Sequence, residues 1–413
     1  MKALRQRQSG SVAGALIIFV LVAALIGMGV WLAVQDEEAE VGAGGEPVSS
    51  QESASSDAAP APEEPLQSLP RLAPSAPYVP QDGVVDVDIS EYAGYAGLVV
   101  ANGGLEPNPD SIFAREYGFQ VRLTLSEEEG WSKLNSGQVG ASVTTADVLA
   151  VLGRQFEVVV PAQIAFSRGA NQVVVDRNIS NINQLKGKVL AASQFNESDF
   201  FIRYLASEAG LPIRILRDLD ARPSDGELGL VFYEDAFVAC DAYAHVLETG
   251  SDRLNGCVGW SPRTDQVVAE APEQAKMLVS NRNLLVIADL LLVNKGFAES
   301  QPQMVEGLVR GLMEGNRQLR DTPEQHLALV GRAFDWSEDD TRDELSKVHF
   351  SNVPENRAFF AGTIDSAGSY QGIFQSSMLA YGSLISNPSD PARFVDLTAL
   401  GALEASGAYA DQR

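Results

Sequence analysis

The sequence predicts an α/β fold of two lobes, each built on a doubly wound sheet and joined by a hinge, preceded by one transmembrane helix and a disordered linker. Three observations lead to this prediction. An uncharged apolar run lies near the N-terminus, a proline-rich stretch follows it, and in the remaining residues, about 330, short β-branched runs alternate with helical patterns. Chains longer than about 250–300 residues usually divide into more than one hydrophobic core, so this length favours two lobes over one.

Residues 12–34 form the predicted transmembrane helix. They contain no charged side chain and, at about 1.5 Å per residue, reach roughly 35 Å, which exceeds the roughly 30 Å of a bilayer core. Basic residues precede the run and acidic residues follow it: Lys2, Arg5, Arg7, Asp36, Glu37, Glu38 and Glu40. This bias predicts a single-pass protein of a bacterial inner membrane, with residues 1–11 in the cytoplasm and the C-terminal domain in the periplasm. A cleaved signal peptide is the alternative, but the run is longer than the roughly 7–15 residues of a signal-peptide core.

Residues 35–82 are rich in proline, serine, alanine and glutamate and contain few large apolar residues. Such a composition cannot bury enough apolar surface to offset the entropy lost on folding. A flexible chain of this length has an end-to-end distance on the order of 40 Å. The stretch is therefore predicted to be a disordered tether between the membrane and the lobes.

The formal net charge of the chain is -25 at pH 7. A surface of this sign repels phosphates and anionic lipid headgroups, so nucleic acid is not an expected partner and the membrane is contacted only through the N-terminal helix. The chain has two cysteines, Cys240 and Cys257. An even count outside the cytoplasm permits a disulfide, with two buried free thiols as the alternative. Their spacing fits no metal-binding motif.

The first lobe is predicted over residues 83–170 and 283–413. Strands are expected at Val84–Ser90, Phe119–Leu125, Ala141–Thr145 and Val158–Ser167, and helices at Tyr95–Asn102 and Glu128–Asn135. The apolar segment Leu284–Asn294 is expected to be a buried strand that returns to this lobe, and the residues after it are mostly helical.

The second lobe is predicted over residues 171–282, where the alternating pattern restarts. Its expected strands are Gln172–Val175, Val189–Ala192, Arg214–Leu219, Leu228–Tyr233 and Cys257–Trp260, and its expected helices are Glu197–Ala209 and Asp235–Leu247. The chain thus crosses between the lobes twice, near Ser167–Asn171 and near Asn281–Ile287. These two crossings form the predicted hinge.

Five short motifs occur in a fixed order along the two lobes. They are Leu134–Val139 followed by Thr144–Asp147, then Phe166–Asn171, Ile182–Lys188, Trp260–Pro262 and Ile287–Val293. Together with the order of elements, they resemble the periplasmic binding proteins of ABC importers of the nitrate, sulfonate, taurine and thiamine-precursor type, over about residues 84–385. The resemblance implies the type II periplasmic-binding-protein-like fold, a small-molecule solute as ligand, and the permease and ATPase subunits of an ABC importer as partners. The sequence departs from the family at Gly140, where an acidic residue is usual, and in its transmembrane anchor.

Candidate site residues follow from the rule that ligands of doubly wound sheets lie beyond the C-terminal ends of the strands. The rule selects Tyr92, Tyr95, Thr144, Thr145, Ser167, Arg168, Gly169, Gln194, Asn196 and Trp260. Hydroxyl and amide side chains beside unpaired N–H groups at helix N-termini suit an anionic or polar solute, and ordinary helix caps are the alternative for Thr144, Thr145, Asn196 and Ser198. Trp260 either stacks on the solute or packs in the core, and Arg168 either pairs with an anion or is exposed.

No motif of a serine hydrolase, a zinc protease, a P-loop protein or a dithiol oxidoreductase occurs, and the three histidines stand singly. The expectation is therefore a binding protein and not an enzyme, without catalytic residues, metal or cofactors. Two functions remain open. In the first, the domain captures a small solute for an ABC importer, and an anion is one candidate for that solute. In the second, it is a tethered ligand-sensing or protein-interaction module.

Overall fold

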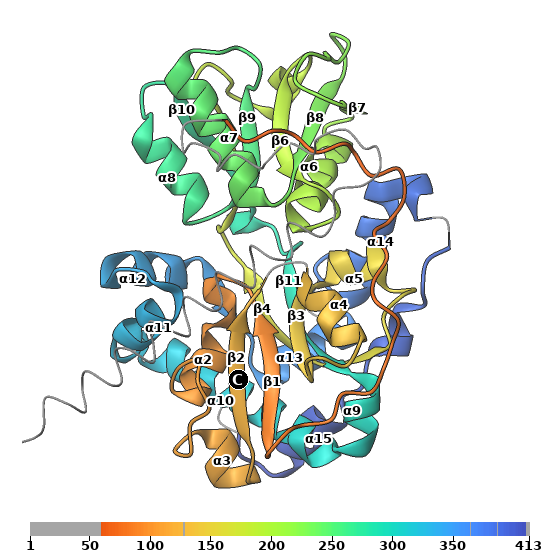
Figure 1. Cartoon of the computed structure of the whole chain (residues 1–413), viewed down its shortest axis with the longest axis vertical. Coiled ribbons are helices and arrows are strands. Elements are labelled where there is room, and N and C mark those ends of the chain that lie inside the picture. The colour runs from red at the N-terminus through yellow and green to blue at the C-terminus, as the bar shows by residue number, and fades with distance from the viewer. Residues whose placement is uncertain (1–58, 127–128, 364, 386, 410–413) are drawn as a thin grey trace, which may run out of the picture. The chain divides into compact units, whose positions relative to one another are not determined.

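The computed structural model describes residues 59–126, 129–363, 365–385 and 387–409. The predicted transmembrane helix, residues 12–34, and the first part of the predicted tether lie outside these ranges. Within them, no helix combines the length and the apolar character that a membrane crossing needs. The described chain forms two mixed sheets of six strands each, and we call the part built on each sheet a lobe (Figure 1).

The first sheet has the strand order β12-β4-β11-β3-β1-β2. Its strands are β1 (Val84–Ile89), β2 (Gln120–Leu125), β3 (Ala141–Thr145), β4 (Val158–Ser167), β11 (Ala288–Asn294) and β12 (Val348–Phe350). Strand β1 is parallel to β2 and β3, whereas β11 is antiparallel to β3 and β4. Every residue of β11 is buried, which explains its nearly continuous apolar sequence.

Helices of the first lobe cover this sheet. They are α2 (Ala96–Asn102), α3 (Ile112–Tyr117), α4 (Glu129–Asn135), α5 (Ala146–Leu152), α9 (Lys295–Ser300), α10 (Pro302–Asp321), α11 (Leu327–Phe334), α12 (Glu338–Ser346), α13 (Val353–Ala361), α14 (Tyr370–Tyr381) and α15 (Thr398–Ala405). Helices α10 and α2 pack very closely, because a Cβ atom at Gly315 would lie 1.9 Å from the carbonyl oxygen of Gly97. Only glycine permits this approach.

The second sheet has the strand order β10-β5-β9-β6-β8-β7. Its strands are β5 (Asn171–Asp176), β6 (Val189–Ser193), β7 (Ile213–Ile215), β8 (Leu228–Tyr233), β9 (Gly256–Trp260) and β10 (Ala275–Ser280), and its helices are α6 (Glu197–Glu208), α7 (Ala236–Thr249) and α8 (Arg263–Glu270). A disulfide joins Cys240 of α7 to Cys257 of β9, with Cα atoms 5.2 Å apart. The two cysteines, for which the sequence left both a disulfide and free thiols open, are thus paired in this structure.

The side chain of Asn281 fixes the two chain segments that connect the sheets. Its Oδ1 atom accepts a hydrogen bond of 2.7 Å from the backbone N–H of Gly169, and its Nδ2 atom donates one of 3.0 Å to the carbonyl of Ser167. Asn281 begins the short 3₁₀ helix η3 (Asn281–Asn283) and is fully buried. One amide therefore ties the outgoing crossing to the returning one.

The prediction that the linker is disordered through residue 82 is wrong for its described part, residues 59–82, which we call the strap. Near its start, Glu63 donates its backbone N–H to the carbonyl of Phe232 in the second lobe. Near its end, Tyr78 is buried in the first lobe, where its ring meets that of Phe297 edge-on. In Figure 1 the strap runs as an orange segment from the second lobe down along the first.

The composition of the strap misled the prediction because the strap has few large apolar residues, although Leu69, Leu72 and Tyr78 pack against the cores of the folded part. Its backbone is held by side-chain amides of both lobes, those of Asn135, Gln155, Gln194 and Asn294. Hydrogen bonds from a preformed surface can order a chain that has no core.

Candidate functional site

Two neighbouring cavities lie between the lobes, beyond the C-terminal ends of β1 and β3. The first is lined by Ser90, Tyr92, Tyr95, Thr145, Asn171, Glu197, Trp260, Ile287 and Asp289. The second is lined by Asp88, Ser90, Tyr95, Ser126, Trp131, Ser142, Val143, Thr144, Thr145, Glu197 and Trp260. Their volumes of about 20 and 30 Å³ hold little more than one or two water molecules. We call this region the cleft.

Asp289 is the central polar group on the first-lobe side of the cleft. Strand β11 is antiparallel to β3, so Asp289 near its start pairs in register with Thr145 at the end of β3. One carboxylate oxygen of Asp289 accepts a hydrogen bond of 3.3 Å from the hydroxyl of Tyr95, and the other has no partner among the described residues. Burial raises the pKa of Asp289 well above its usual value.

Two tyrosines and two threonines surround this carboxyl group. Tyr92 and Tyr95 follow β1 and contact each other edge to face, with ring centroids 5.4 Å apart. The hydroxyl groups of Tyr92, Thr144 and Thr145 are buried and lack a hydrogen-bond partner among the described residues. Buried polar atoms without partners are costly, and they mark a place where a bound molecule supplies the missing bonds.

The second-lobe side of the cleft is formed by Trp260 and Glu197. Trp260 ends β9, its ring contacts that of Phe237 at a centroid distance of 5.2 Å, and its indole N–H has no partner among the described residues. Glu197 is the first residue of α6 and lines both cavities. Five of the candidate residues therefore meet in the cleft: Tyr92, Tyr95, Thr144, Thr145 and Trp260.

The other candidates have different positions. The hydroxyl of Ser167 donates to Asn171 over 2.7 Å, and the Gly169 backbone is held by Asn281, so both belong to the hinge. Gln194 binds the backbone of Leu66 in the strap. Asn196 caps α6 by accepting hydrogen bonds from the N–H groups of the second and third helical residues.

Arg168 lies in a separate, larger cavity beside the hinge. This cavity is about 400 Å³ and is lined by Phe166, Arg168, Arg282, Asn283, Leu285, His349, Ser351 and Glu355. Arg168 is exposed, and its guanidinium is not among the groups that line the cleft. Arg168 thus lies outside the two cavities of the cleft, and its pairing with an anion stays a prediction.

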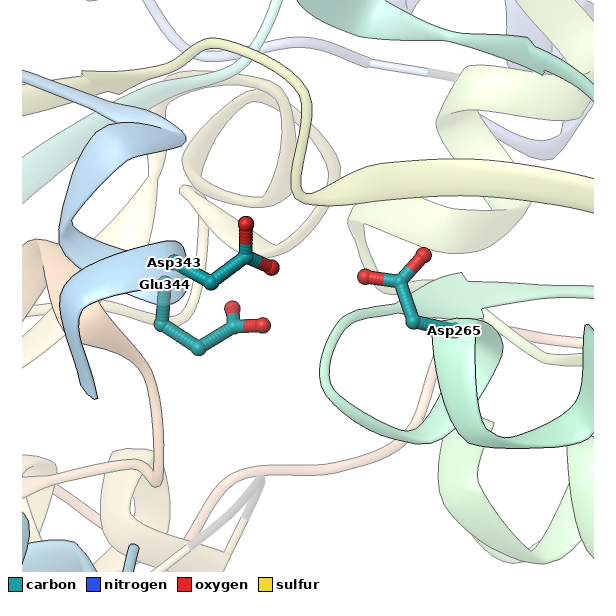
Figure 2. A group of neighbouring side chains, drawn as sticks. All are labelled: Asp265, Asp343 and Glu344. Carbon is teal, nitrogen blue, oxygen red and sulfur yellow. The ribbon is translucent and has the colours of Figure 1, made fainter. Parts of the chain in front are cut away.

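A group of three carboxylates from both lobes is the best candidate for a metal centre among the described residues. Their oxygens lie within 4.8 Å of one another, and Figure 2 shows Asp265 pointing toward Asp343 and Glu344. The ammonium group of Lys347, however, lies 2.5, 2.7 and 2.6 Å from these carboxylates, in the place that a cation would take. We call the four residues the clasp, because Asp265 is in α8 of the second lobe and the others lie in or directly after α12 of the first.

The clasp is partly buried and tightly bonded. Glu344 is nearly inaccessible and also accepts a hydrogen bond of 2.6 Å from the hydroxyl of Ser261. Burial opposes the charge of Lys347, but the charge of Glu344 and the hydrogen bonds of Asp265 and Asp343 raise its pKa above the usual value. Lys347 therefore stays charged at any physiological pH.

Sequence reasoning missed three acidic residues of the cleft, Asp88, Glu197 and Asp289. Asp88 lies inside β1 and pairs with Lys133 at 3.5 Å. Asp289 lies within the motif Ile287–Val293 but near the start of β11, whereas the rule selects residues at the C-terminal ends of strands. Glu197 looks like an ordinary acidic residue in a first helical turn.

Comparison with solved structures finds the same fold in proteins of low sequence identity. The periplasmic aliphatic sulphonate-binding protein SsuA of Escherichia coli is 14% identical, with a TM-score of 0.57 over 76% of this chain and 92% of that chain. A ligand-binding component of an ABC-type import system from Staphylococcus aureus, solved with zinc bound, is 12% identical, with a TM-score of 0.55 over 78% of this chain and 98% of that chain. The desulfurization enzyme DSZB is 11% identical, with a TM-score of 0.53 over 78% of this chain and 99% of that chain.

No protein-family model and no curated protein matches the sequence. At such low identity, the structural likenesses establish the fold. The described chain has the type II, two-lobed periplasmic-binding-protein fold that binding components of ABC import systems share with at least one enzyme.

Proposed function

We propose that this chain is a membrane-tethered solute-binding protein that captures a small solute between its two lobes for an ABC importer. The observation that carries the proposal is the set of buried polar groups without partners in the cleft. Thr145, Asp289 and Tyr92 of the first lobe and Trp260 of the second contribute them. A solute bound there would satisfy groups of both lobes at once and would favour their closed arrangement.

The small volume of the cleft supports a closing mechanism. A solute larger than one or two water molecules does not fit the present cavities, so the lobes must separate to admit it. The crossings tied by Asn281 are the natural axis of this motion, and the clasp adds an ionic contact to the closed form. The closed form would then dock on the permease and ATPase subunits.

The proposed location is the bacterial inner membrane, with the lobes in the periplasm and residues 12–34 as the single anchor. The charge bias around that run supports the orientation. The disulfide between Cys240 and Cys257 fits an oxidising compartment.

Binding, rather than catalysis, is supported by the side chains that line the cleft. Among the described residues of the two cavities, none is cysteine, histidine or lysine. Both cysteines of the chain are joined in the disulfide of the second lobe. The lining residues of the cleft thus offer carboxyl and hydroxyl groups, but no thiol, imidazole or amine that would act as nucleophile or activate a hydroxyl group.

A tethered sensor is a second candidate function, and the strap favours it. Because the strap contacts both lobes, their relative position is coupled to the chain segment that leads toward the N-terminus. A partner protein that binds the strap in only one position of the lobes would therefore respond to solute binding in the cleft.

The test combines ligand identification with transport. Native mass spectrometry of the purified protein identifies a co-purified solute, and small-angle scattering with and without that solute measures lobe closure. Uptake of the solute in cells with and without the chain then separates import from sensing. An unchanged scattering profile at saturating solute would reject capture between the lobes, and unchanged uptake would favour the sensor.

A further inference from the structure

Among the described residues that line the cleft, three carry carboxyl groups and none is lysine or arginine. The three are Asp88, Glu197 and Asp289. Asp88 is matched by Lys133 at 3.5 Å and by the hydroxyl of Ser126 at 2.9 Å. Asp289 keeps one carboxylate oxygen without a partner, although the residue is 1% exposed. The cleft therefore presents carboxyl groups, and no basic side chain among its described lining residues, where a solute would lie.

The helix N-terminus that enters the cleft is already used by the chain itself. Asn196 accepts hydrogen bonds from the N–H groups of Ser198 and Asp199, and a carboxylate oxygen of Asp199 accepts one from the N–H of Phe195. Glu197 and Asp199 both stand in the first turn of α6. Asp199 is paired with Arg203 of the same helix at 2.6 Å, so its charge is compensated. An anionic solute would therefore find these donors occupied and the carboxyl group of Glu197 beside them.

Aromatic rings enclose the same space from both lobes. Tyr92 and Tyr95 lie on one side and Trp260 on the other. Aromatic faces attract cations through the ring quadrupole, most strongly where water is excluded. The indole N–H of Trp260 is a donor without a partner, so the solute also carries a hydroxyl or carbonyl oxygen.

We propose that the cleft takes a small organic cation, an amine or quaternary ammonium compound that bears an oxygen acceptor, with Asp289 as its charge partner. This assignment rests on the proposed capture of a solute between the lobes. It gives the chain a ligand of opposite charge to that of the sulphonate-binding protein whose fold it shares.

The assignment implies that Asp289 changes its protonation when the solute binds. Burial raises the pKa of its carboxyl group, the nearby Asp147 raises it further, and the hydrogen bond from Tyr95 lowers it. Tyr92 and Glu197 line the same cavity. An arriving ammonium group favours the ionised carboxylate, so binding of the cation releases a proton.

The experiment uses the full-length protein in detergent and a metabolite extract of the cells that make it, separated by ion exchange into cationic, neutral and anionic fractions. Each fraction is added in a dilution series, and the melting temperature is followed. The cationic fraction should raise the melting temperature of the wild-type protein. In D289N, and in E197Q as a second variant, the same rise in melting temperature should require about tenfold more of the fraction. Each variant replaces a carboxylate by a neutral amide, and hydrogen bonds to charged groups are stronger than those between neutral groups.

The exposed residue Asp252 supplies a control with the same change of net charge, and D252N should respond as the wild type does. Stabilisation by the neutral or anionic fraction alone would overturn the cation assignment while leaving solute capture intact. Stabilisation by no fraction would overturn both. An undiminished response of folded D289N would remove Asp289 as the charge partner, and if D289N does not fold, E197Q decides by the same criterion.

Discussion

The ammonium group of Lys347 lies 2.5 Å from a carboxylate oxygen of Asp265, and this ion pair joins the two lobes. Asp265 also accepts a hydrogen bond of 3.0 Å from the side chain of Gln172 in β5. Lys347 is anchored in the first lobe by Glu344 and Asp343. The contact exists only while the lobes are close, so it stabilises the closed arrangement.

Replacing Lys347 by methionine should favour the open arrangement and destabilise the domain by about 2 kcal/mol, because it leaves the buried Glu344 without its cation. Small-angle scattering should show a larger radius of gyration in the solute-free variant. Lys295→Met is the matched control, since Lys295 pairs with Glu157 at the surface and should cost less than about 0.5 kcal/mol. Equal scattering profiles of K347M and wild type would contradict a role of the clasp in closure.

Removing single polar groups from the cleft should weaken solute binding without unfolding a lobe. Thr145→Val and Trp260→Phe keep most of the side-chain volume and delete one hydroxyl and one N–H group. We expect each to cost about 1–3 kcal/mol of binding free energy, measured by calorimetry with the solute found by mass spectrometry. Thr145→Ser retains the hydroxyl and should bind within about threefold of the wild type. Unchanged affinity in both deletions would place the solute elsewhere.

Deleting the strap should lower the free energy of unfolding of the domain, whereas deleting only the residues before the strap should not. Deletion of residues 1–58 leaves every described contact in place. Deletion of residues 1–82 takes away the buried Tyr78 and the hydrogen bonds to Asn294, and should destabilise the domain by about 2–4 kcal/mol. Chemical denaturation of the two truncated proteins measures the difference, and equal midpoints would show that the strap contributes nothing.

Asp147 should make the domain less stable as the pH rises. Complete burial raises its pKa to about 7, and its neighbours Asp289 and Tyr381 add no compensating positive charge. The folded pKa lies above the unfolded value near 4, so the folded state holds the proton more tightly and stability falls between about pH 4 and pH 7. Asp147→Asn should therefore stabilise the protein at pH 8, by at most about 4 kcal/mol, and should have little effect below pH 4. A variant equally stabilised at both values would contradict the titration of Asp147.

Several residues of the cleft could be selected from the sequence, because ligands of parallel sheets bind beyond the C-terminal ends of the strands. Tyr92 and Tyr95 follow β1, and Thr144 and Thr145 are the last two residues of β3. Asp289 was not predictable from that rule, since β11 runs antiparallel and brings its N-terminal end to the same edge. The direction of one strand within the sheet is a tertiary property.

Hydrogen bonding explains why two of the candidate residues lie outside the cleft. Gln194 and Asn196 are amides after a strand end, the pattern expected of ligand-binding residues, yet one holds the strap and the other caps α6. The sequence pattern is the same in either role. Only the partner of each amide distinguishes them, and the partner lies far away in the chain.

If residues 12–34 anchor the chain as proposed, the strap also affects how far the lobes can lie from the membrane. Residues 63–78 run along the surface of both lobes, so their length is not available as spacer while they remain docked. Released, these residues would add roughly 50 Å of extended chain, about 3.3 Å for each residue. If the lobes open only when the strap detaches, the empty form gains this slack and searches a larger volume for solute, whereas the filled form is drawn closer to the bilayer where a permease would receive it.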